Sequence, residues 1–372
     1  MIAMIVRKIL ILLLFVSSAA YGRQPEAEAF DHSVDRWLKA NRGRHYPRFE
    51  ASQFREIADN ILAYQNEDGG WPKNLDMMAK SDPDSVRQSL TPRYRSSTLD
   101  NGNIYTQIAY LSEAYRATGE KRYRDGARRG VEYILSIQYP HGGWRGWDVD
   151  AITFNDNVMP GVLWLWLDIL EGQPRYAWVD RKLRARIRRS WERGLDLLLR
   201  CQWVRADGEK TVWPQQCDHE TLAPVGARAF ELPGLVSAES ATVVMLLMRI
   251  ENPSPAVVEA VKSAVAWYDK TKITGKRIVT VDVPEGLPED RSVKRDRRLV
   301  DDPEAAPIWA RYYEAESDEY FFATRERRKV RSLEEVPAER RVGYAWFNEF
   351  GNKLLEMYPA WLARIGEQGR KQ

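Results

Sequence analysis

Apolar residues recur at helical spacing along most of the chain. A first helix is predicted to begin near Ser52, an N-cap residue, with apolar positions at Ile57, Ile61 and Leu62. Comparable spacing predicts further helices over residues 103–117, 123–137, 158–170, 183–199, 238–249 and 256–270. The segment 158–170 is very apolar, so it is expected to lie deep in the core.

The ends of three predicted helices share one motif. Each has a glutamine at the helix end and a tryptophan after the following turn: Gln65 and Trp71, Gln138 and Trp144, Gln202 and Trp213. The motif returns after about 65–75 residues, which is long enough for two helices and their loops. It therefore predicts three helical hairpins, in which the tryptophan packs back on the helix end and the glutamine bonds the loop backbone.

The helix pairs favour a mainly α fold, a partial α/α barrel (toroid) built from helical hairpins over residues 49–275. After residue 275 the pattern changes. Residues 277–281 are β-like, 308–313 and 320–322 are predicted as short strands, and 346–365 return to helix. Residues 276–372 are therefore expected to add coil, short strands and a C-terminal helix that closes one side of a cleft, within a single domain overall.

The N-terminus has the pattern of a signal peptide over residues 1–22. Arg7 and Lys8 precede an apolar run at 9–16, and small residues at 17–22 allow cleavage after Ala20 or Gly22. An uncleaved N-terminal anchor is the alternative. A polar leader is predicted over residues 23–48. No later stretch is apolar and long enough to span a membrane, so an exported protein, periplasmic or extracellular and free of the membrane after cleavage, is expected.

Charge and composition narrow the range of possible binding partners. The chain has 56 basic and 53 acidic side chains, a net charge of +3, and this balance does not predict nucleic-acid binding. It does allow a local basic cleft for an acidic polymer. The 14 Trp, 17 Tyr and 10 Phe residues are assigned mainly to the core, with a platform for sugar rings as the alternative. Cys201 and Cys217 are equally compatible with a disulfide and with free thiols.

Polar residues gather in four clusters at predicted loops or helix ends, over residues 69–77, 98–103, 152–157 and 214–218, the last of which leads on to 227–231. Functional groups are commonly displayed in such places. Asp100 and Asp156 each precede a predicted helix, and a simple N-cap role accounts for either of them. That role does not explain the asparagines beside both aspartates.

In this order, the four clusters resemble the pectate lyases of the tenth polysaccharide lyase family. The resemblance continues through 231–233, 309–313, 321–325 and 340–346, and covers roughly residues 50–350. It implies a partial α/α barrel with added coil and short strands, and an active cleft between these parts. It also implies an acidic polysaccharide, polygalacturonate, as substrate, cleavage by β-elimination, and a calcium cofactor. A monomer is expected.

The resemblance also implies roles for individual residues. Asp156, with Asp100 nearby, is expected to hold calcium; Arg228 and Arg311 to bind substrate carboxylates; and Arg325 to act as the catalytic base. Further substrate contacts are expected from Lys73 and Asn101, with Asp100 beside them. The chain departs from many relatives at Ala151, where they have His, at Gly226, where they often have Trp, and at 326–328, which replace an acidic-glycine turn.

Three other functions compete with this interpretation. A toroid-fold hydrolase of uronate-containing glycans would use Asp100 and Asp156 as paired carboxylates. A non-catalytic pectate-binding homologue would keep the aromatic residues and the basic cleft without turnover. A terpenoid cyclase or prenyltransferase also carries repeated Gln…Gly-Trp turns, but it needs an Asp-rich motif or a Cys/His zinc set, and the sequence contains neither.

Overall fold

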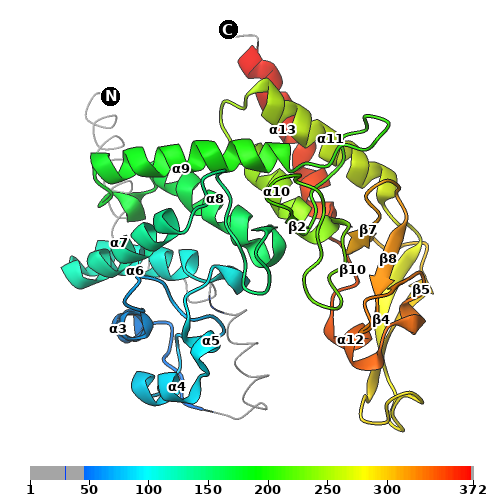
Figure 1. The fold of residues 1–372 in the computed structure, drawn as a ribbon, viewed down its shortest axis with the longest axis horizontal. Helices are drawn as coiled ribbons and strands as arrows, with labels where there is room; N and C mark the ends of the chain where they lie inside the picture. Colours follow the sequence, from blue (N-terminus) through cyan, green and yellow to red (C-terminus); the bar gives the residue numbers. More distant parts are fainter. Residues whose placement is uncertain (1–29, 31–45, 370–372) are drawn as a thin grey trace, which may run out of the picture. The chain divides into compact units, whose positions relative to one another are not determined.

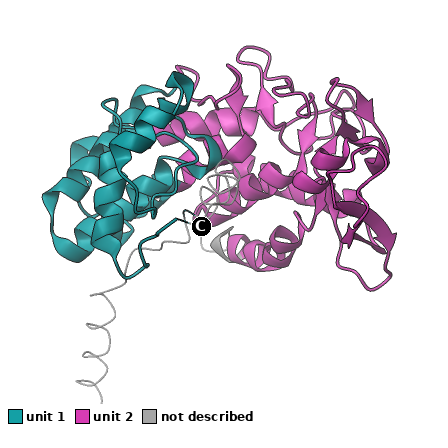
Figure 2. Cartoon of the chain, turned by 90° about the horizontal axis from the view of Figure 1, so that it is seen from below, with its two compact units in different colours: residues 1–138, 165–189 teal, residues 139–164, 190–372 magenta. Residues whose placement is uncertain are grey.

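The computed structural model describes residue 30 and residues 46–369, which form two compact units (Figures 1 and 2). Unit 1 comprises the chain up to residue 138 together with 165–189, and unit 2 comprises 139–164 together with the chain from 190 onward. The predicted signal peptide lies outside the described residues, as does the leader except for residues 30 and 46–48. Both stay predictions.

Unit 1 is helical. Its main helices are α3 (Phe54–Tyr64), α6 (Tyr105–Thr118) and α7 (Lys121–Ser136), which pack against one another. Gly119 lies between α6 and α7 with a left-handed backbone (φ 72°), and this conformation ends α6 and lets the chain reverse. The short helices α4 (Pro83–Ser89) and α5 (Pro92–Arg95) each begin with proline, whose missing N–H is not needed there.

Unit 2 combines helices with short strands. Helices α10 (Ser237–Arg249), α11 (Pro255–Thr271) and α13 (Asn352–Gly369) pack together, and α12 (Ala338–Gly343) packs on β5. Helices α8 (Val158–Leu170) and α9 (Arg181–Arg200) contribute residues to both units. The described residues of α8 are largely buried, as its apolar composition predicts.

The strands of unit 2 form four antiparallel sheets. The largest has the order β3 (Leu235–Val236), β7 (Tyr312–Tyr313), β8 (Tyr320–Ala323) and β9 (Lys329–Val330). The others pair β4 (Lys276–Asp282) with β5 (Arg295–Asp301), β1 (Ile152–Thr153) with β2 (Gln216–Cys217), and β6 (Trp309–Ala310) with β10 (Phe347–Asn348). The strands predicted after residue 275 are confirmed, whereas β1, β2 and β3 are too short to give a periodic signal.

The glutamine and tryptophan motif has the predicted structure in the first and third repeats. Gln65 Nε2 donates to Gly69 O (2.8 Å), and Trp71 Nε1 donates to Ile61 O (2.7 Å). In the third repeat, Gln202 Nε2 donates to Thr211 O (2.8 Å), and Trp213 Nε1 donates to Leu198 O (2.7 Å). Each indole thus satisfies a carbonyl near a helix end while it fills the core.

The predicted partial α/α barrel (toroid) is wrong. The helices of residues 49–275 divide between the two units, and no barrel of helices closes within the described part of the chain. Helix (46% of the chain) still exceeds strand (13%), but the strands form four separate sheets. Apolar spacing identifies each helix and its buried face. It does not encode the direction in which successive hairpins curve, because long-range packing decides that.

The predicted boundary between residues 275 and 276 coincides with the first residue of β4, and it falls inside unit 2. As a domain boundary it stays a prediction. Within residues 30 and 46–369, no helix has the length and apolar character needed to cross a membrane.

Candidate functional site

The three repeats share a backbone contact that positions polar residues. In each repeat the carbonyl of the motif tryptophan accepts a hydrogen bond from a later residue: Trp71 from Thr98 (3.3 Å), Trp144 from Thr153 (3.0 Å) and Trp213 from Val236 (3.0 Å). Three residues further on stand Asn101, Asp156 and Glu239. The repeat therefore places a polar side chain at an equivalent position three times, and two of these residues were predicted for the site.

In unit 1, Lys73 and Asp100 form a buried ion pair. The Lys73 side chain is 6% exposed and that of Asp100 is 5% exposed, and Lys73 Nζ donates to Asp100 Oδ2. Next to this pair, Asn101 Nδ2 donates to Asn74 Oδ1 (2.8 Å). The structure thus brings together the three residues that the sequence predicted here, Lys73, Asp100 and Asn101.

The asparagines of the 98–103 cluster hold its unusual backbone. Asn101 has a left-handed conformation (φ 60°), which asparagine tolerates better than most residues. Asn103 Nδ2 donates to Trp71 O (2.6 Å) and Thr98 O (2.8 Å), and Gln107 Oε1 accepts from Ile104 N (2.6 Å). Asn103 and Gln107 therefore fix the turn before α6.

In unit 2, the turn before α8 presents Asp156. Asp156 and Asn157 both have left-handed backbones (φ 51° and 57°), and Asn155 Nδ2 donates to Asp156 Oδ2 (3.2 Å). Asp156 is half-buried, and its side chain is therefore within reach of a ligand. Consecutive left-handed residues other than glycine are costly, and such strain clusters at functional sites.

Arg228 lies in the electrostatic field of Asp156. The guanidinium donates to the buried Glu231 carboxylate (Nε to Oε1, 2.9 Å), and its Nε lies 3.4 Å from Asp148 Oδ2. Burial opposes the charged form of Arg228, but the hydrogen bond to Glu231 and the charges of Glu231, Asp156 and Asp148 raise its pKa above the ordinary value. Arg228 is thus a fixed cation beside Asp156.

Arg311 forms a second ion pair, with Glu239 of α10. Arg311 Nη2 donates to Glu239 Oε1, and both side chains are nearly buried. Burial works to lower the pKa of Arg311, and the carboxylate of Glu239 outweighs this and raises it above its ordinary range. Burial raises the pKa of Glu239, against the opposing charge of Arg311. The backbone of Asp156 also hydrogen-bonds Glu239, so the second pair lies close to the first turn of α8.

A chain of buried polar side chains joins these groups. Tyr312 OH donates to Gln215 Oε1 (3.0 Å), and Gln215 Nε2 donates to Asn155 Oδ1 (2.7 Å). The hydroxyls of Tyr312 and Tyr344 lie 2.7 Å apart. Because Tyr312 gives its proton to Gln215, Tyr344 must donate to Tyr312. Burial raises the pKa of both phenols, so the chain stays neutral and rigid at ordinary pH.

Arg325 lies on an exposed turn after β8. Its side chain is 63% exposed, it donates to the Glu339 carboxylate, and its guanidinium stands 5.6 Å from the centre of the Phe230 ring. Phe230 precedes Glu231, the partner of Arg228. Unit 2 therefore places Arg325 next to the loop that carries Arg228.

Two departures from the family pattern adjoin each other in this region. A Cβ built on Gly226 would lie 2.8 Å from Glu231 O and 3.2 Å from Arg327 Nη2. Arg327 has a left-handed backbone (φ 61°), and its Nη1 donates to Ala227 O (2.9 Å). No side chain fits at residue 226 unless the loop moves, because the backbone oxygen of Glu231 lies too close, and Arg327 adjoins the same space.

The fit of calcium to these residues differs between the two predicted ligands. Calcium takes about six to eight oxygen ligands, and the described residues contain no group of three or more His, Cys, Asp or Glu that could hold a metal. Asp156, half-buried on a strained turn, fits as a single protein carboxylate whose other ligands come from water and an anionic substrate. Asp100 fits less well, because its carboxylate faces the Lys73 ammonium.

The sequence did not reveal several residues of unit 2. Glu239 is hidden inside a helix with an apolar pattern, and the only signal was its polarity among the alanines and valines of α10. Asp148 gave no local signal of a site, whereas Tyr312 and Tyr344 lie in stretches that resemble the family but had no predicted role of their own. Cys201 and Cys217 are buried free thiols that interact with each other, and burial raises the pKa of Cys217 well above its ordinary value.

Comparisons with known proteins show which family the chain resembles. The family model for pectic acid lyases matches residues 65–355. A family 10 polysaccharide lyase from Cellvibrio cellulosa, solved as a point mutant in complex with trigalacturonic acid, is 26% identical with a TM-score of 0.70, over 91% of this chain and 99% of that one. Another structure of a family 10 polysaccharide lyase from that organism is 25% identical with a TM-score of 0.70, over 92% and 98%. A comparison with curated proteins gives no match.

The family model and the similar solved structures show that the chain is a polysaccharide lyase. The chain belongs to the pectic acid lyase family. Of the predicted site residues, Asp156, Arg228, Arg311 and Arg325 lie in unit 2, and Lys73, Asp100 and Asn101 lie in unit 1. Their individual roles stay predictions.

Proposed function

We propose that this lyase cleaves α-1,4-linked polygalacturonate by calcium-assisted β-elimination, which yields unsaturated oligogalacturonates. The observation that carries the proposal is the half-buried Asp156 carboxylate beside the fixed guanidinium of Arg228. An anionic sugar ring needs a cation for its carboxylate, and a carboxylate on the protein can share a hard cation with it. The trigalacturonic acid bound to the related lyase supports the choice of polymer.

The reaction determines which groups are needed. A base removes the proton from C5, which is next to the ring carboxylate; the electron pair forms the C4–C5 double bond, and the C4–O bond breaks. The departing oxygen is protonated to complete the balance. Charge develops on a group that is already anionic, so cations around the carboxylate lower the barrier. Calcium held by Asp156 would supply a hard positive charge there.

The arginines of unit 2 divide this work in the proposal. Arg228 and Arg311 bind substrate carboxylates, because each is kept charged by a buried glutamate and presents a planar fork. Arg325 is the proposed base. Its guanidinium donates to the Glu339 carboxylate, so Arg325 must leave this carboxylate before it can reach the sugar ring. A neutral guanidinium base requires alkaline solution, so an alkaline activity optimum is expected.

Export of the mature chain is part of the proposal, since a pectic polymer is too large to enter a cell. It rests on the predicted signal peptide over residues 1–22.

Product analysis tests the proposal. The mature protein is incubated with polygalacturonate, with calcium or with a chelator, while ultraviolet absorbance and reducing ends are both recorded. Elimination predicts a calcium-dependent rise in absorbance in step with the reducing ends. New reducing ends without absorbance would indicate hydrolysis and overturn the proposed chemistry. An absorbance rise that is unchanged by chelator would overturn the role of calcium alone.

Variants of the exposed turn test the base. Arg325→Ala and Arg325→Lys are both expected to lose activity by roughly 10²–10⁴-fold, the usual contribution of a positioned base. Glu339→Gln serves as the matched variant: it removes the carboxylate to which Arg325 donates but keeps the guanidinium, so activity is expected to be retained. An active Arg325→Ala would contradict Arg325 as the base.

A further inference from the structure

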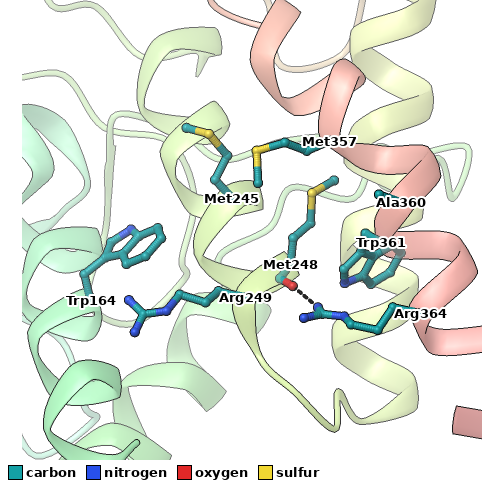
Figure 3. A pocket seen from close by; sticks show the side chains of 8 residues that line it. All are labelled: Trp164, Met245, Met248, Arg249, Met357, Ala360, Trp361 and Arg364. Atoms are coloured by element: carbon teal, nitrogen blue, oxygen red, sulfur yellow. Dashed lines mark hydrogen bonds between the residues drawn. The ribbon is translucent and has the colours of Figure 1, made fainter. Parts of the chain in front are cut away.

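A pocket of about 410 Å³ lies in unit 2 between α10, α13 and the part of α8 that belongs to this unit (Figure 3). None of the residues discussed for the lyase site lines it. Its volume falls in the range of about 300–1,000 Å³ that is usual for small-molecule sites. The pocket is therefore large enough for a ligand and is not explained by the proposed function.

The pocket walls are aromatic and thioether groups. Trp164 and Trp361 contribute indole rings, and Met245, Met248 and Met357 contribute sulfur atoms (Figure 3). Met357 is 39% exposed, one of the few large apolar side chains with such exposure among the described residues. Methionine side chains adapt to ligands of different shape and make favourable contacts with aromatic rings. This lining favours a flat aromatic ligand over a sugar.

The polar groups of the pocket are all hydrogen-bond donors. Arg249 and Arg364 are the charged residues that line it, and no acidic residue does so. The guanidinium of Arg249 stands 4.9 Å from the centre of the Trp164 ring, so the cation is fixed on an indole wall. The Nη2 of Arg364 donates to Met248 O, at the end of α10, which leaves its Nε for another acceptor.

Two of these donors are buried without a partner. Trp361 is 4% exposed, and neither its Nε1 nor the Nε of Arg364 has a hydrogen-bond partner. Figure 3 shows the Trp361 indole nitrogen on the side of the ring that faces the Arg364 guanidinium. Two N–H groups of residues that line the same pocket thus lack an acceptor, which costs free energy unless an acceptor arrives. An anion held by both would remove this cost.

We propose that this pocket binds a small aromatic carboxylate. The ring lies among Trp164, Trp361 and the methionines, and the carboxylate accepts hydrogen bonds from Trp361 Nε1 and Arg364 Nε. Entry requires the exposed Met357 side chain to move aside, which its three rotatable bonds allow at low cost. The absence of an acidic group from the lining explains why an anion is preferred to a neutral or cationic ligand of the same shape.

Titration calorimetry with matched probes tests the proposal on the mature protein. The probes are 2-naphthoate and 2-naphthalenemethanol, which share the ring system and differ in charge. Saturable one-to-one binding of 2-naphthoate is expected, about tenfold or more tighter than that of the alcohol. Equal binding of the two probes, or no binding of 2-naphthoate up to its solubility limit, would overturn the proposal.

Variants locate the bound probe. Met357→Glu places a negative charge at the mouth of the pocket, so it is expected to weaken the binding of 2-naphthoate about tenfold. Met357→Gln adds no charge and is expected to change this affinity by less than about threefold. Trp361→Phe keeps an aromatic ring but loses the N–H, so it should weaken the binding of 2-naphthoate and leave the binding of 2-naphthalenemethanol unchanged. Val204→Glu is the control, because Val204 is also exposed (46%) in unit 2 but lies outside the pocket.

Two further results of these binding experiments would contradict the proposed ligand site. Binding of 2-naphthoate that Met357→Glu and Trp361→Phe leave intact would place the probe elsewhere and overturn the proposal. Concentration-dependent dimerisation that Met357→Glu abolishes would show that a second copy of the chain covers the pocket, and this too would overturn it. Circular dichroism of each variant confirms that the fold is retained.

Discussion

Two turns of the molecule share a backbone pattern but place their aspartates in different surroundings. The first, at 98–102 in unit 1, has the sequence Thr-Leu-Asp-Asn-Gly, and the second, at 153–157 in unit 2, has Thr-Phe-Asn-Asp-Asn. In both turns the threonine N–H bonds the carbonyl of a motif tryptophan, and the fourth residue has a left-handed backbone. The aspartate and asparagine have exchanged places between the two turns.

The exchange decides what each carboxylate can do. Asp100 stands before the left-handed residue and is buried against Lys73, whereas Asp156 is the left-handed residue itself and is half-buried beside Arg228. A buried ion pair contributes structure, and a partly exposed carboxylate near a fixed cation can bind a ligand. One step in register therefore separates an aspartate that is buried in an ion pair from one that is half-buried near a fixed cation.

The largest expected effect comes from the second turn. Asp156→Asn should lower lyase activity by roughly 10³-fold, because it removes the carboxylate that is proposed to hold the calcium, and with it the positive charge that would stabilise the developing anion. Its melting temperature should stay close to wild type, since the side chain is only half-buried and Asn tolerates left-handed φ. Initial rates and thermal melts measure both quantities. A large fall in the melting temperature with activity per folded molecule retained would reverse the two roles.

The first turn should respond in the opposite way. Asp100→Asn leaves the buried Lys73 ammonium without its counter-charge, so the free energy of unfolding should fall by about 3 kcal/mol. The double variant Lys73→Met and Asp100→Leu removes both charges and should recover part of this loss. Chemical denaturation gives the values. Equal stability of Asp100→Asn and wild type would refute a structural role for the pair.

A smaller effect is expected from the left-handed residues themselves. Asn101→Gly should change the free energy of unfolding by a few tenths of a kcal/mol, and Asn101→Ala should cost about 1 kcal/mol, because alanine is strained at φ 60°. The same pair of substitutions at Asn157 (φ 57°) provides the comparison in unit 2. Alanine variants as stable as the glycine variants would show that neither turn depends on this conformation.

The smallest expected effect is a pH dependence confined to unit 2. His141 Nε2 lies 2.9 Å from His219 Nδ1, and Gly143 N–H donates to His141 Nδ1 (3.2 Å). Burial, with the nearby His219, lowers the pKa of His141 below its usual 6.5.

As the pH falls below about 6.5, the unfolded chain therefore takes up the proton first, and stability falls with the pH. His141→Gln should flatten this slope between about pH 5 and 6.5. Urea denaturation at several pH values measures it. A slope that is identical in wild type and His141→Gln would assign the pH dependence to other groups.

Much of the local structure was predictable from the sequence. Helical periodicity located the main helices, and the repeated glutamine and tryptophan identified side chains that cap helix ends in the structure. Both signals are local, so they persist whatever the tertiary arrangement. The toroid prediction was wrong because the arrangement of the helices depends on contacts between hairpins that are far apart along the chain.

The residues of the candidate site were also predictable only in part, for the same reason: local motifs can be read from the sequence, but tertiary packing cannot. Asp156, Arg228, Arg311 and Arg325 stand in polar motifs within loops or short strands, and the resemblance carried them over together. Glu239 was missed, since a single acidic residue in a helix is normally solvent-exposed and only the packed structure shows it buried against Arg311. The burial of Lys73 and Asp100 was missed for a similar reason: sequence gives the charges but not the depth at which they pair.

The most direct test of the account is a calcium titration of lyase activity on polygalacturonate for wild type, Asp156→Asn and Asp100→Asn, each corrected for its folded fraction. The account predicts that Asp156→Asn needs far more calcium or shows no activity at any concentration. It predicts that the folded fraction of Asp100→Asn keeps the calcium dependence of wild type. A wild-type calcium response in Asp156→Asn, with a shifted response in Asp100→Asn, would contradict it.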